Sequence, residues 1–514
     1  MQTTLTRQTD VLVIGGGAAG IRAALAASGA GADVLLLTQG RPTFHGATFA
    51  GLGRGWGYQA LPAAERTVRN LERFYDEIIQ TGLGCAHPRL ARILAEESGP
   101  CLQDLLAYGL ILKTDAENRF LRVPGCFSST PRAFLALDRQ NIRTTFGRML
   151  RRSGAATLNV SVLGLIMSDR CCRGAWGVTP TGEILLARAK AVILANGGGS
   201  GLFLTQAGPV GQTGSGYAWA LAAGATMKNL EFIQFLLGFR QGRKLGLLPL
   251  NRLREPQAIT DPAGQDLLRT ALPNNRLRQR ALSLRQAHAP FSSRDDSGLI
   301  DRAIAESFLR NEKVFYHDSS VPDPREVLHL AQAFNGGIRI NTQAASTIPG
   351  LYAAGEIAAG PHGADRIGGC LLAATQVFGA RAGRAAALYA KRIKALPRPV
   401  VPPELRRLRL SKNHSDREPV DEILMATRKK FSQEVMILRS ESGLTECLAF
   451  LDRARNDIRT MKHLSSLKIT SLQAIMVMEA VTRAALLRKN SLGSHYRTDD
   501  PKVHRRGAEI AEKK

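Results

Sequence analysis

The chain has 514 residues, 44% of them hydrophobic and 6% aromatic, and a formal net charge of +26. A chain this long exceeds what one hydrophobic core usually holds, so two or three domains are expected. It has no run of 18 uncharged apolar residues, no signal peptide before the first predicted strand, and no CxxC or ferredoxin spacing among its seven cysteines. These absences predict a cytoplasmic protein with no membrane span, metal site or disulfide framework.

The first predicted strand, residues 10–14, is an almost continuous apolar run, as expected for a strand buried on both faces. It leads into Gly15-Gly-Gly-Ala-Ala-Gly20, then into a helical stretch and a second strand over residues 21–37. In such a βαβ unit, GxGxxG permits a tight turn, close approach of the backbone to a pyrophosphate, and close packing of the helix on the strand. The pattern predicts a dinucleotide-binding fold.

The second predicted strand ends in Thr38-Gln39, where a NAD-binding unit usually carries an acidic residue for the ribose. Without that acid, plain NAD binding is disfavoured. We expect a hydroxyl or the backbone to contact the ribose instead.

Two further buried strands follow, residues 191–195, which end in Asn196-Gly-Gly-Gly199, and residues 349–356, which end in Glu356. A long interval separates them, so the nucleotide domain is expected to be discontinuous. Inserted domains favour a substrate site in the cleft that they form with the nucleotide domain. The predicted fold is α/β, with a Rossmann-type domain over 1–230 and 346–395, an inserted α+β capping domain over 231–345, and a C-terminal helical domain over 396–514.

The C-terminal domain is predicted to begin with a stiff proline-rich linker over 396–403 and to contain helices around 420–439 and 470–489. Residues 391–514 carry 27 Lys and Arg against 15 Asp and Glu, and residues 240–286 carry 10 against 3. This charge fits a solvated surface, steering of an anionic substrate, or docking of an acidic protein. Nucleic-acid contact ranks last, because no aromatic-interleaved basic motif accompanies the charge.

Several motifs recur in a fixed order along nearly the whole chain. They are VLVIGGGAAGIRAALAA and GATFAGLG within 11–53, ANGGGSGLF and TGSGYAWALAAGATMKNLEFIQF within 195–235, SSRDDSGLIDRAI (292–304), FNGGIRIN (334–341), GLYAAGEIAAGPHGADRIGGCLLAATQVFGARAG (350–383) and RKNSLGSHYRTDDP (488–501). Together they resemble the succinate dehydrogenase/fumarate reductase flavoprotein family, which includes L-aspartate oxidase and the adenylylsulfate reductase flavoprotein. The resemblance implies FAD as the cofactor of the Rossmann-type domain.

In such proteins Glu356 would hold the ribityl or ribose region, and the backbone of Leu371 and Leu372 would contact the isoalloxazine ring at a helix N-terminus. That helix end would stabilise negative charge on the reduced flavin. The predicted cofactor contacts are Gly15, Gly17, Ala18, Ala19, Gly20, Thr38, Gln39, Thr48, Gly53, Val162, Asn196, Gly197, Glu356, Leu371 and Leu372.

The family's chemistry moves a hydride between the flavin and a substrate carbon, with an arginine as proton shuttle. Arg294 in SSRD matches the shuttle, and Arg366 in HGADRIGG matches the arginine that clamps a carboxylate. The alternative for Arg294 is a salt bridge with Asp295 or Asp296.

Two histidines of the family pattern are absent. Leu236 stands in place of the first, in the family's QFHP segment, and Gln332 in place of the second, in its HYxMGGI segment. Leucine cannot pair with a buried carboxylate, so succinate and fumarate are disfavoured as substrates. An amino acid or another monocarboxylate with a less polar far end fits better.

Three other histidines bear on the site. His362 in HGADR matches the family pattern, and we expect it to shape its loop. His495 in GSHYR either reaches the substrate or anchors the tail. Respiratory members of the family bond the flavin through a histidine at the position of Ala47 here, whereas His45 lies two residues early, so noncovalent FAD is expected.

These features support an FAD-dependent oxidase or dehydrogenase acting on a small carboxylate, similar to L-aspartate oxidase but with an altered substrate pocket. The alternative is the flavoprotein subunit of an electron-transfer complex of the fumarate reductase or adenylylsulfate reductase type, with an acidic partner. A third hypothesis, a basic binding protein on a degenerate scaffold, is disfavoured because the glycine motif, Glu356 and both arginines are present.

Overall fold

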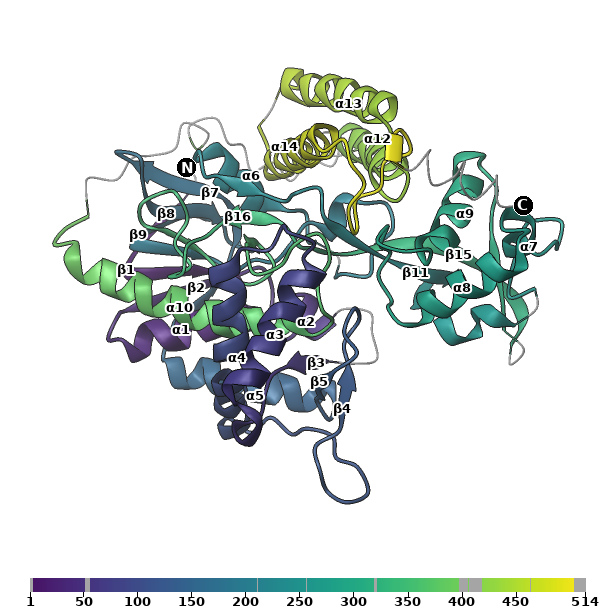
Figure 1. Cartoon of the computed structure of the whole chain (residues 1–514). Helices are drawn as coiled ribbons and strands as arrows, with labels where there is room; N and C mark the ends of the chain where they lie inside the picture. The colour runs from purple at the N-terminus through teal and green to yellow at the C-terminus, as the bar shows by residue number, and fades with distance from the viewer. Residues whose placement is uncertain are drawn as a thin grey trace.

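The computed structural model describes residues 3–50, 56–209, 211–255, 257–318, 321–396, 405, 418–462 and 464–502. Within these residues it places the N-terminal βαβ unit, an inserted lobe and a helical C-terminal region around one main hydrophobic core (Figure 1). The predicted α/β class is confirmed.

The central sheet has seven strands in the order β6-β2-β1-β9-β8-β7, and β17 also pairs with β9. The strands β1, β2, β6, β9 and β17 run parallel, while β7 and β8 form an antiparallel ribbon at one edge. Their bounds are β1 (Thr4–Ile14), β2 (Val34–Thr38), β6 (Ala156–Asn159), β7 (Ser161–Ser168), β8 (Cys171–Val178), β9 (Ile184–Leu194) and β17 (Leu351–Ala353). A strand from after the inserted lobe therefore completes the sheet that begins at the N-terminus.

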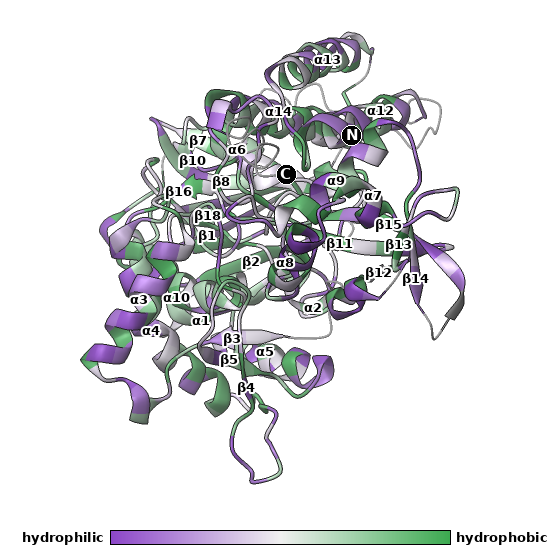
Figure 2. Ribbon diagram, turned by 45° about the vertical axis from the view of Figure 1, so that its right-hand side comes forward, coloured by the Kyte–Doolittle hydropathy of each residue, from purple (hydrophilic) through white to green (hydrophobic). Residues whose placement is uncertain are grey.

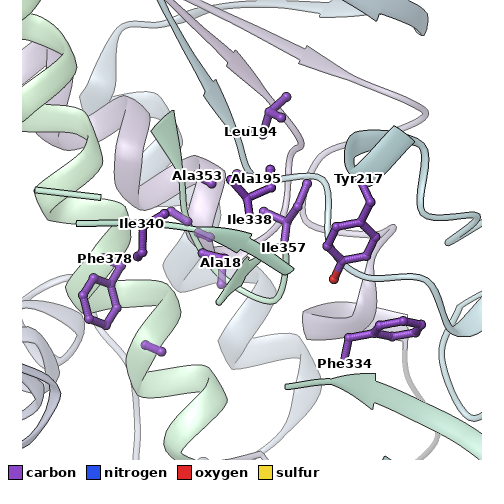
Figure 3. Packing of buried hydrophobic residues seen from close by; sticks show 14 of the residues in the cluster. Ala18, Leu194, Ala195, Tyr217, Phe334, Ile338, Ile340, Ala353, Ile357 and Phe378 are labelled. Atoms are coloured by element: carbon purple, nitrogen blue, oxygen red, sulfur yellow. The ribbon is translucent and has the colours of Figure 1, made fainter. Parts of the chain in front are cut away.

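The centre of this sheet is fully covered. Val11, Leu12 and Val13 of β1 are all 0% exposed, and each such side chain stabilises the fold by about 1.5–3 kcal/mol through burial. Figure 3 shows Tyr217 and Phe334 beside Ile357 at the end of this core, where the Tyr217 hydroxyl donates to the Glu356 carbonyl at 3.2 Å. The core thus reaches the residues that flank Glu356.

Helices α1 (Ala18–Gly29) and α10 (Cys370–Arg392) lie against each other on one side of the sheet (Figure 1). A Cβ on Gly383 would lie 2.3 Å from the Ala23 carbonyl oxygen, so the two helices approach closely only because this position is glycine. Helices α3 (Val68–Thr81), α4 (Pro88–Ala107) and α5 (Arg139–Ser153) surround them, and Figure 2 shows hydrophilic residues along α3 and α4 at the edge of the molecule.

Short elements connect these layers. They are α2 (Ala47–Ala50), β3 (Gly57–Gln59), β4 (Arg122–Pro124), β5 (Pro131–Leu135), α6 (Ser215–Ala222), β10 (Met227–Lys228), β16 (Gly337–Arg339), β18 (Ala358–Ala359) and the 3₁₀ turns Ala63–Glu65, Ser200–Leu202 and Leu250–Arg254. The strands among them form two three-stranded sheets, β3-β5-β4 and β10-β16-β18.

The inserted lobe contains a five-stranded antiparallel sheet in the order β12-β11-β15-β14-β13, with three helices on it (Figure 1). The bounds are β11 (Ile233–Gln241), β12 (Lys244–Leu247), β13 (Ile259–Thr260), α7 (Leu267–Ala271), α8 (Asn275–Gln286), α9 (Gly298–Leu309), β14 (Phe315–Asp318) and β15 (Val321–Phe334). This lobe has its own hydrophobic cluster, in which Ile300, Ile304 and Val327 are fully buried. The long strands β11 and β15 join it to the rest of the chain.

The described residues of the C-terminal region form three helices where two were predicted: α12 (Glu418–Val435), α13 (Glu441–Thr460) and α14 (Ser466–Leu487). The sequence prediction missed α13, whose buried Leu444, Cys447, Leu451 and Ile458 recur at helical spacing among many charged residues. The predicted linker lies outside the described residues after Leu396. Helix α14 alone among the described helices is long and apolar enough to cross a membrane, and half of its apolar window is buried inside the fold.

Candidate active site

The glycine turn between β1 and α1 is open on one side and closed on the others. A Cβ on Gly15, where φ is +120°, would lie 2.3 Å from the Ala195 carbonyl oxygen, and one on Gly20 would lie 1.8 Å from that of Gly15. Gly17 is different, because a Cβ there would meet nothing within 4 Å. Gly17 is also the N-cap of α1, which has no side-chain cap and no acidic residue in its first turn. Apart from the Ala18 N–H, which donates to Thr48, the N–H groups of the first turn and the open space beside Gly17 suit a phosphate group.

Helix α2 and the loop before it lie against this turn. The Ala18 N–H donates to the Thr48 hydroxyl at 3.4 Å, and the Arg143 guanidinium donates to the Phe49 carbonyl at 3.3 Å. Arg143 also lies 4.6 Å from the centre of the Phe44 ring. Packing therefore holds Thr48 next to the glycine turn.

Of the other predicted nucleotide contacts, Thr38 lies beside the glycine turn and Gln39 points to solvent. Thr38 is buried, and a Cβ on Gly16 would lie 2.8 Å from its hydroxyl, whereas Gln39 is exposed. Val162 is half-buried in β7. Gly53 lies outside the described residues.

Glu356 is buried at the end of β17, and its Oε1 atom accepts a hydrogen bond from the Phe334 N–H at 3.0 Å. Burial raises the pKa of Glu356 to about 7, against hydrogen bonds from the backbone of Phe334 and Gly198 and the charge of Arg366. Asn196 lies two residues before Gly198, and its Oδ1 atom is buried without a hydrogen-bond partner among the described residues. The protein backbone thus holds one Glu356 oxygen, and its contact with the cofactor stays a prediction.

A second free helix N-terminus belongs to α10. Its N-cap is Gly369, with φ +90°, and the helix has neither a side-chain cap nor an acidic residue in its first turn. Leu371 and Leu372 lie half-buried in that turn. Free N–H groups and the positive end of a 23-residue helix meet the electrostatic requirement for stabilising a reduced flavin ring.

Arg366 is buried and has only neutral hydrogen-bond partners among the described residues. Its guanidinium donates to Gln234 Oε1, to Asn335 Oδ1 at 3.3 Å and to the Ile367 carbonyl at 3.5 Å. Burial lowers the pKa of Arg366 below its usual value. A buried cation without a bonded carboxylate is costly until an anion joins it.

Arg294 is fixed by three contacts. Its Nε atom donates to Asp365 Oδ2 at 2.9 Å, its Nη2 atom donates to the Thr81 carbonyl at 3.0 Å, and its guanidinium carbon lies 4.7 Å from the centre of the Phe127 ring. The alternative given for Arg294, a salt bridge, is present, but its partner is Asp365 and the predicted partners Asp295 and Asp296 were wrong. One of these, Asp296, pairs with Arg280.

The two positions that lack the family histidines lie on β11 and β15. Gln332 is the extra residue of a β-bulge, since Gln234 pairs with Ala333 and Phe235 with Ala331. Leu236 is 3% exposed and packs with Ala207 and Leu330 in a small apolar cluster. Because side chains two residues apart in a strand share a face, Leu236 lies on the same face of β11 as Gln234, the partner of Arg366. An apolar surface therefore adjoins the buried cation.

The two predicted histidines have different environments. His362 is buried, its Nε2 atom has no partner among the described residues, and burial together with Arg366 lowers its pKa well below the usual value. His495 uses both ring nitrogens: Nδ1 accepts from Arg439 Nη1 at 2.6 Å, and Nε2 donates to the Arg488 carbonyl at 3.0 Å. Of the two roles open for His495, these bonds favour anchoring of the tail.

A family profile described as an FAD binding domain matches residues 10–372, most of the chain. The chain belongs to the FAD-binding succinate dehydrogenase/fumarate reductase flavoprotein family. This flavoprotein is therefore an FAD-dependent oxidoreductase, as the motifs predicted.

Its similarity to relatives extends over almost the whole length. The flavoprotein is 28% identical to a subunit of the fumarate reductase (CoM/CoB) of Methanothermobacter marburgensis, over 96% of this chain and 95% of the relative. It is 26% identical to an L-aspartate oxidase of Caulobacter vibrioides, over 95% and 93% of the two chains. Among solved structures, a quinol-fumarate reductase with menaquinol molecules shares the fold, with a TM-score of 0.78 at 20% identity over 97% of this chain and 93% of that one.

Four residues of the site were missing from the sequence prediction: Gln234, Asn335, Asp365 and Phe127. The first three lie inside motifs that carried the family resemblance, and Asp365 directly precedes Arg366, so each could have been examined as a partner of an arginine. Phe127 has a φ of +64° and lies in no motif, so no sequence signal pointed to it.

Proposed function

We propose that this flavoprotein moves a hydride between FAD and one carbon of a small monocarboxylate, with an amino acid as the leading substrate class. The buried Arg366 guanidinium, which has only neutral partners among the described residues, carries this proposal. A substrate carboxylate would supply the missing anion, and a charge-assisted hydrogen bond of this kind contributes about 1.5–3 kcal/mol.

The apolar cluster beside Gln234 supports a substrate with one carboxylate. A second carboxylate directed at Leu236, Ala207 and Leu330 would lose its hydration without gaining a donor. An apolar or weakly polar far end avoids that cost, so succinate and fumarate fit less well.

The predicted cofactor contacts agree with this arrangement. The α1 N-terminus at Gly17 would hold the pyrophosphate, and the α10 N-terminus at Leu371 and Leu372 would face the isoalloxazine ring. The bound FAD supplies the site that accepts or donates the hydride. Arg294 would exchange the accompanying proton on the neighbouring substrate carbon.

The test is an anaerobic spectral titration of the purified holoprotein with amino acids, other monocarboxylates and dicarboxylates. We expect one monocarboxylate to bleach the flavin band, and Arg366→Gln to abolish that bleaching while FAD stays bound. Arg240→Gln is a matched control. Arg240 lies in the same strand as Gln234, and it forms a partly exposed ion pair with Glu326 of the neighbouring strand. Bleaching by succinate but by no monocarboxylate would contradict the proposed substrate class.

A second candidate function is the flavoprotein subunit of an electron-transfer complex. The relative named as a fumarate reductase subunit, together with the net charge of +26, favours it, since a basic surface suits an acidic partner. In that case the reduced protein would reoxidise slowly in air, and it would elute from an extract of its native cells as a hetero-oligomer. Rapid reoxidation by oxygen of a protein that elutes alone would favour the oxidase.

A further inference from the structure

A cavity of about 320 Å³ is lined by the start of α4 and by the small sheet β10-β16-β18. None of its lining residues belongs to the predicted cofactor or substrate contacts. Its volume lies at the lower end of the range for small-molecule sites, which is about 300–1,000 Å³. The cavity therefore has room for a small ligand, and its walls differ from those of the site around Arg366.

The small sheet places two basic side chains at this cavity. Lys228 of β10 pairs with Gly337 of β16, and Arg339 of β16 pairs with Ala359 of β18, so three segments far apart in the sequence form one wall. Lys228 is half-buried and Arg339 is exposed. Neither side chain forms a hydrogen bond or an ion pair with another described residue. Two cations without a carboxylate partner give the cavity a positive potential.

The start of α4 adds to this potential. His87 is the N-cap of the helix and makes no side-chain cap hydrogen bond, Pro88 follows it, and the first turn contains no acidic residue. The Ala91 N–H donates to the His87 carbonyl at 2.9 Å, and the N–H groups of Arg89 and Leu90 precede this first helical bond. The positive end of a 20-residue helix thus lies at the cavity wall.

A ring nitrogen of His87 lacks a partner at the same wall. Its Nδ1 atom is buried, and no described residue bonds it. The His87 backbone is held in place, because its N–H donates to the Gly360 carbonyl at 2.7 Å. A buried polar atom without a hydrogen bond is costly, and an anionic ligand oxygen in the cavity would accept a bond from a protonated Nδ1.

The rest of the lining is largely apolar. Leu90, Ile340 and Ala359 are buried, and Met227 is half-buried. None of the lining residues in the described part of the chain is acidic. A ligand with a hydrocarbon body would remove this apolar surface from water, whereas a bare inorganic anion would leave it hydrated.

We propose that this cavity is a second ligand site, for a small organic carboxylate. Lys228, Arg339 and the start of α4 bind the carboxylate, and the apolar lining receives a short hydrocarbon body. Binding here goes beyond the proposed function, because it uses neither the predicted flavin contacts nor the two arginines assigned to the redox reaction.

The test is a ligand-observed NMR titration of the holoprotein with butyrate, acetate and inorganic phosphate. The titrations use the Arg366→Gln variant, because Arg366 is the carboxylate site of the proposed function. We expect butyrate to bind about tenfold more tightly than acetate, since it buries two more methylene groups. Phosphate that binds as tightly as butyrate would overturn the assignment to an organic carboxylate.

Two substitutions test the basic side chains. Lys228→Gln and Arg339→Gln should each weaken butyrate binding about tenfold, because a hydrogen bond between charged groups is lost. Arg243→Gln and Lys244→Gln are matched controls, since both residues are exposed at the turn between β11 and β12 and each change removes one positive charge. Melting curves verify that every variant is folded. Equal weakening in the controls would indicate general attraction to a basic surface and would overturn the site.

The wild-type holoprotein separates this site from the proposed function. Butyrate should occupy two sites there, one lost in Arg366→Gln and the other lost when Lys228→Gln and Arg339→Gln are combined. Absence of butyrate binding in Arg366→Gln would overturn the second site and leave the proposed function intact. A single wild-type site that disappears only in the combined variant would support the second site and contradict the carboxylate role of Arg366.

Discussion

The backbone N–H of Ser293 donates to the Gly493 carbonyl at 2.7 Å, and the Ser293 hydroxyl donates to the same oxygen at 2.9 Å. These residues lie 200 positions apart in the sequence. The next tail residue, Ser494, donates its hydroxyl to the Ala364 carbonyl at 3.0 Å. The C-terminal loop therefore contacts the residue before Arg294 and the residue before Asp365, and it holds this pair from both sides.

Gly493→Ala should disturb this contact. A Cβ at Gly493, where φ is +54°, would lie 2.8–3.0 Å from atoms of Ala364. We expect a kcat at least severalfold lower and a reduced melting temperature, with FAD still bound. Gly242→Ala is the matched control, because its φ is +58° and a Cβ there would meet nothing within 4 Å. Equal effects of the two changes would show that backbone strain alone, and not the tail contact, matters.

Arg294→Ala should leave FAD bound while turnover falls by about 10²–10⁴-fold, because the proton shuttle is lost. Steady-state kinetics and the flavin absorbance of the same sample measure both quantities. Arg280→Ala removes a largely exposed arginine that pairs with the nearby Asp296, and it should retain activity. Retained turnover in Arg294→Ala would contradict the shuttle assignment.

Gly17→Val should reduce flavin occupancy without unfolding the protein. The open space beside Gly17 would fill with the new side chain, which would block the approach of the pyrophosphate. Gly29→Val, at the far end of α1, also meets open space at Cβ and should keep its flavin. The ratio of flavin to protein absorbance and the melting curve give the result. Full occupancy in Gly17→Val would refute this placement of the cofactor.

Leu236→His should raise the affinity for dicarboxylates, because it places a donor on the face of β11 that carries Gln234. Burying the imidazole in the apolar cluster should cost about 1–3 kcal/mol of folding free energy. Perturbation of the flavin spectrum by succinate and fumarate gives the dissociation constants, and urea unfolding gives the stability. Leu236→Met keeps an apolar side chain of similar volume and should change neither property strongly. Unchanged dicarboxylate affinity in Leu236→His would show that this position does not contact the far end of the substrate.

Acid precipitation should release all of the FAD into the supernatant. Ala47 begins α2 at the position where respiratory relatives are expected to carry the flavin-bonding histidine, and an alanine cannot form that bond. The Nδ1 atom of His45 lies 3.1 Å from the Arg41 carbonyl oxygen, so the ring is engaged within its own loop. Yellow colour that remains in the washed pellet, and is lost in His45→Ala, would show a covalent bond through His45.

Features that depend on local patterns could be predicted from the order of the residues. The apolar run at residues 10–14 and the glycines after it define the βαβ unit, because neighbouring residues decide strand burial, the turn and the helix start. The ordered motifs also identified the family and FAD before any contact was known. The weaker periodicity of α13 was missed, because many charged residues separate its buried positions.

The partners of the two arginines, in contrast, depend on how distant segments pack together. Asp365 lies 71 residues from Arg294, and Gln234 lies 132 residues from Arg366. Such pairs form where the inserted lobe, the loop after β17 and the C-terminal tail meet, and no local pattern encodes that meeting. Charge alone suggested Asp295 and Asp296 for Arg294, since they are adjacent in sequence. Burial reverses that preference, because inside the fold the arginine pairs with Asp365, whose side chain is 0% exposed, and a charge pair shielded from water interacts more strongly than one at the surface.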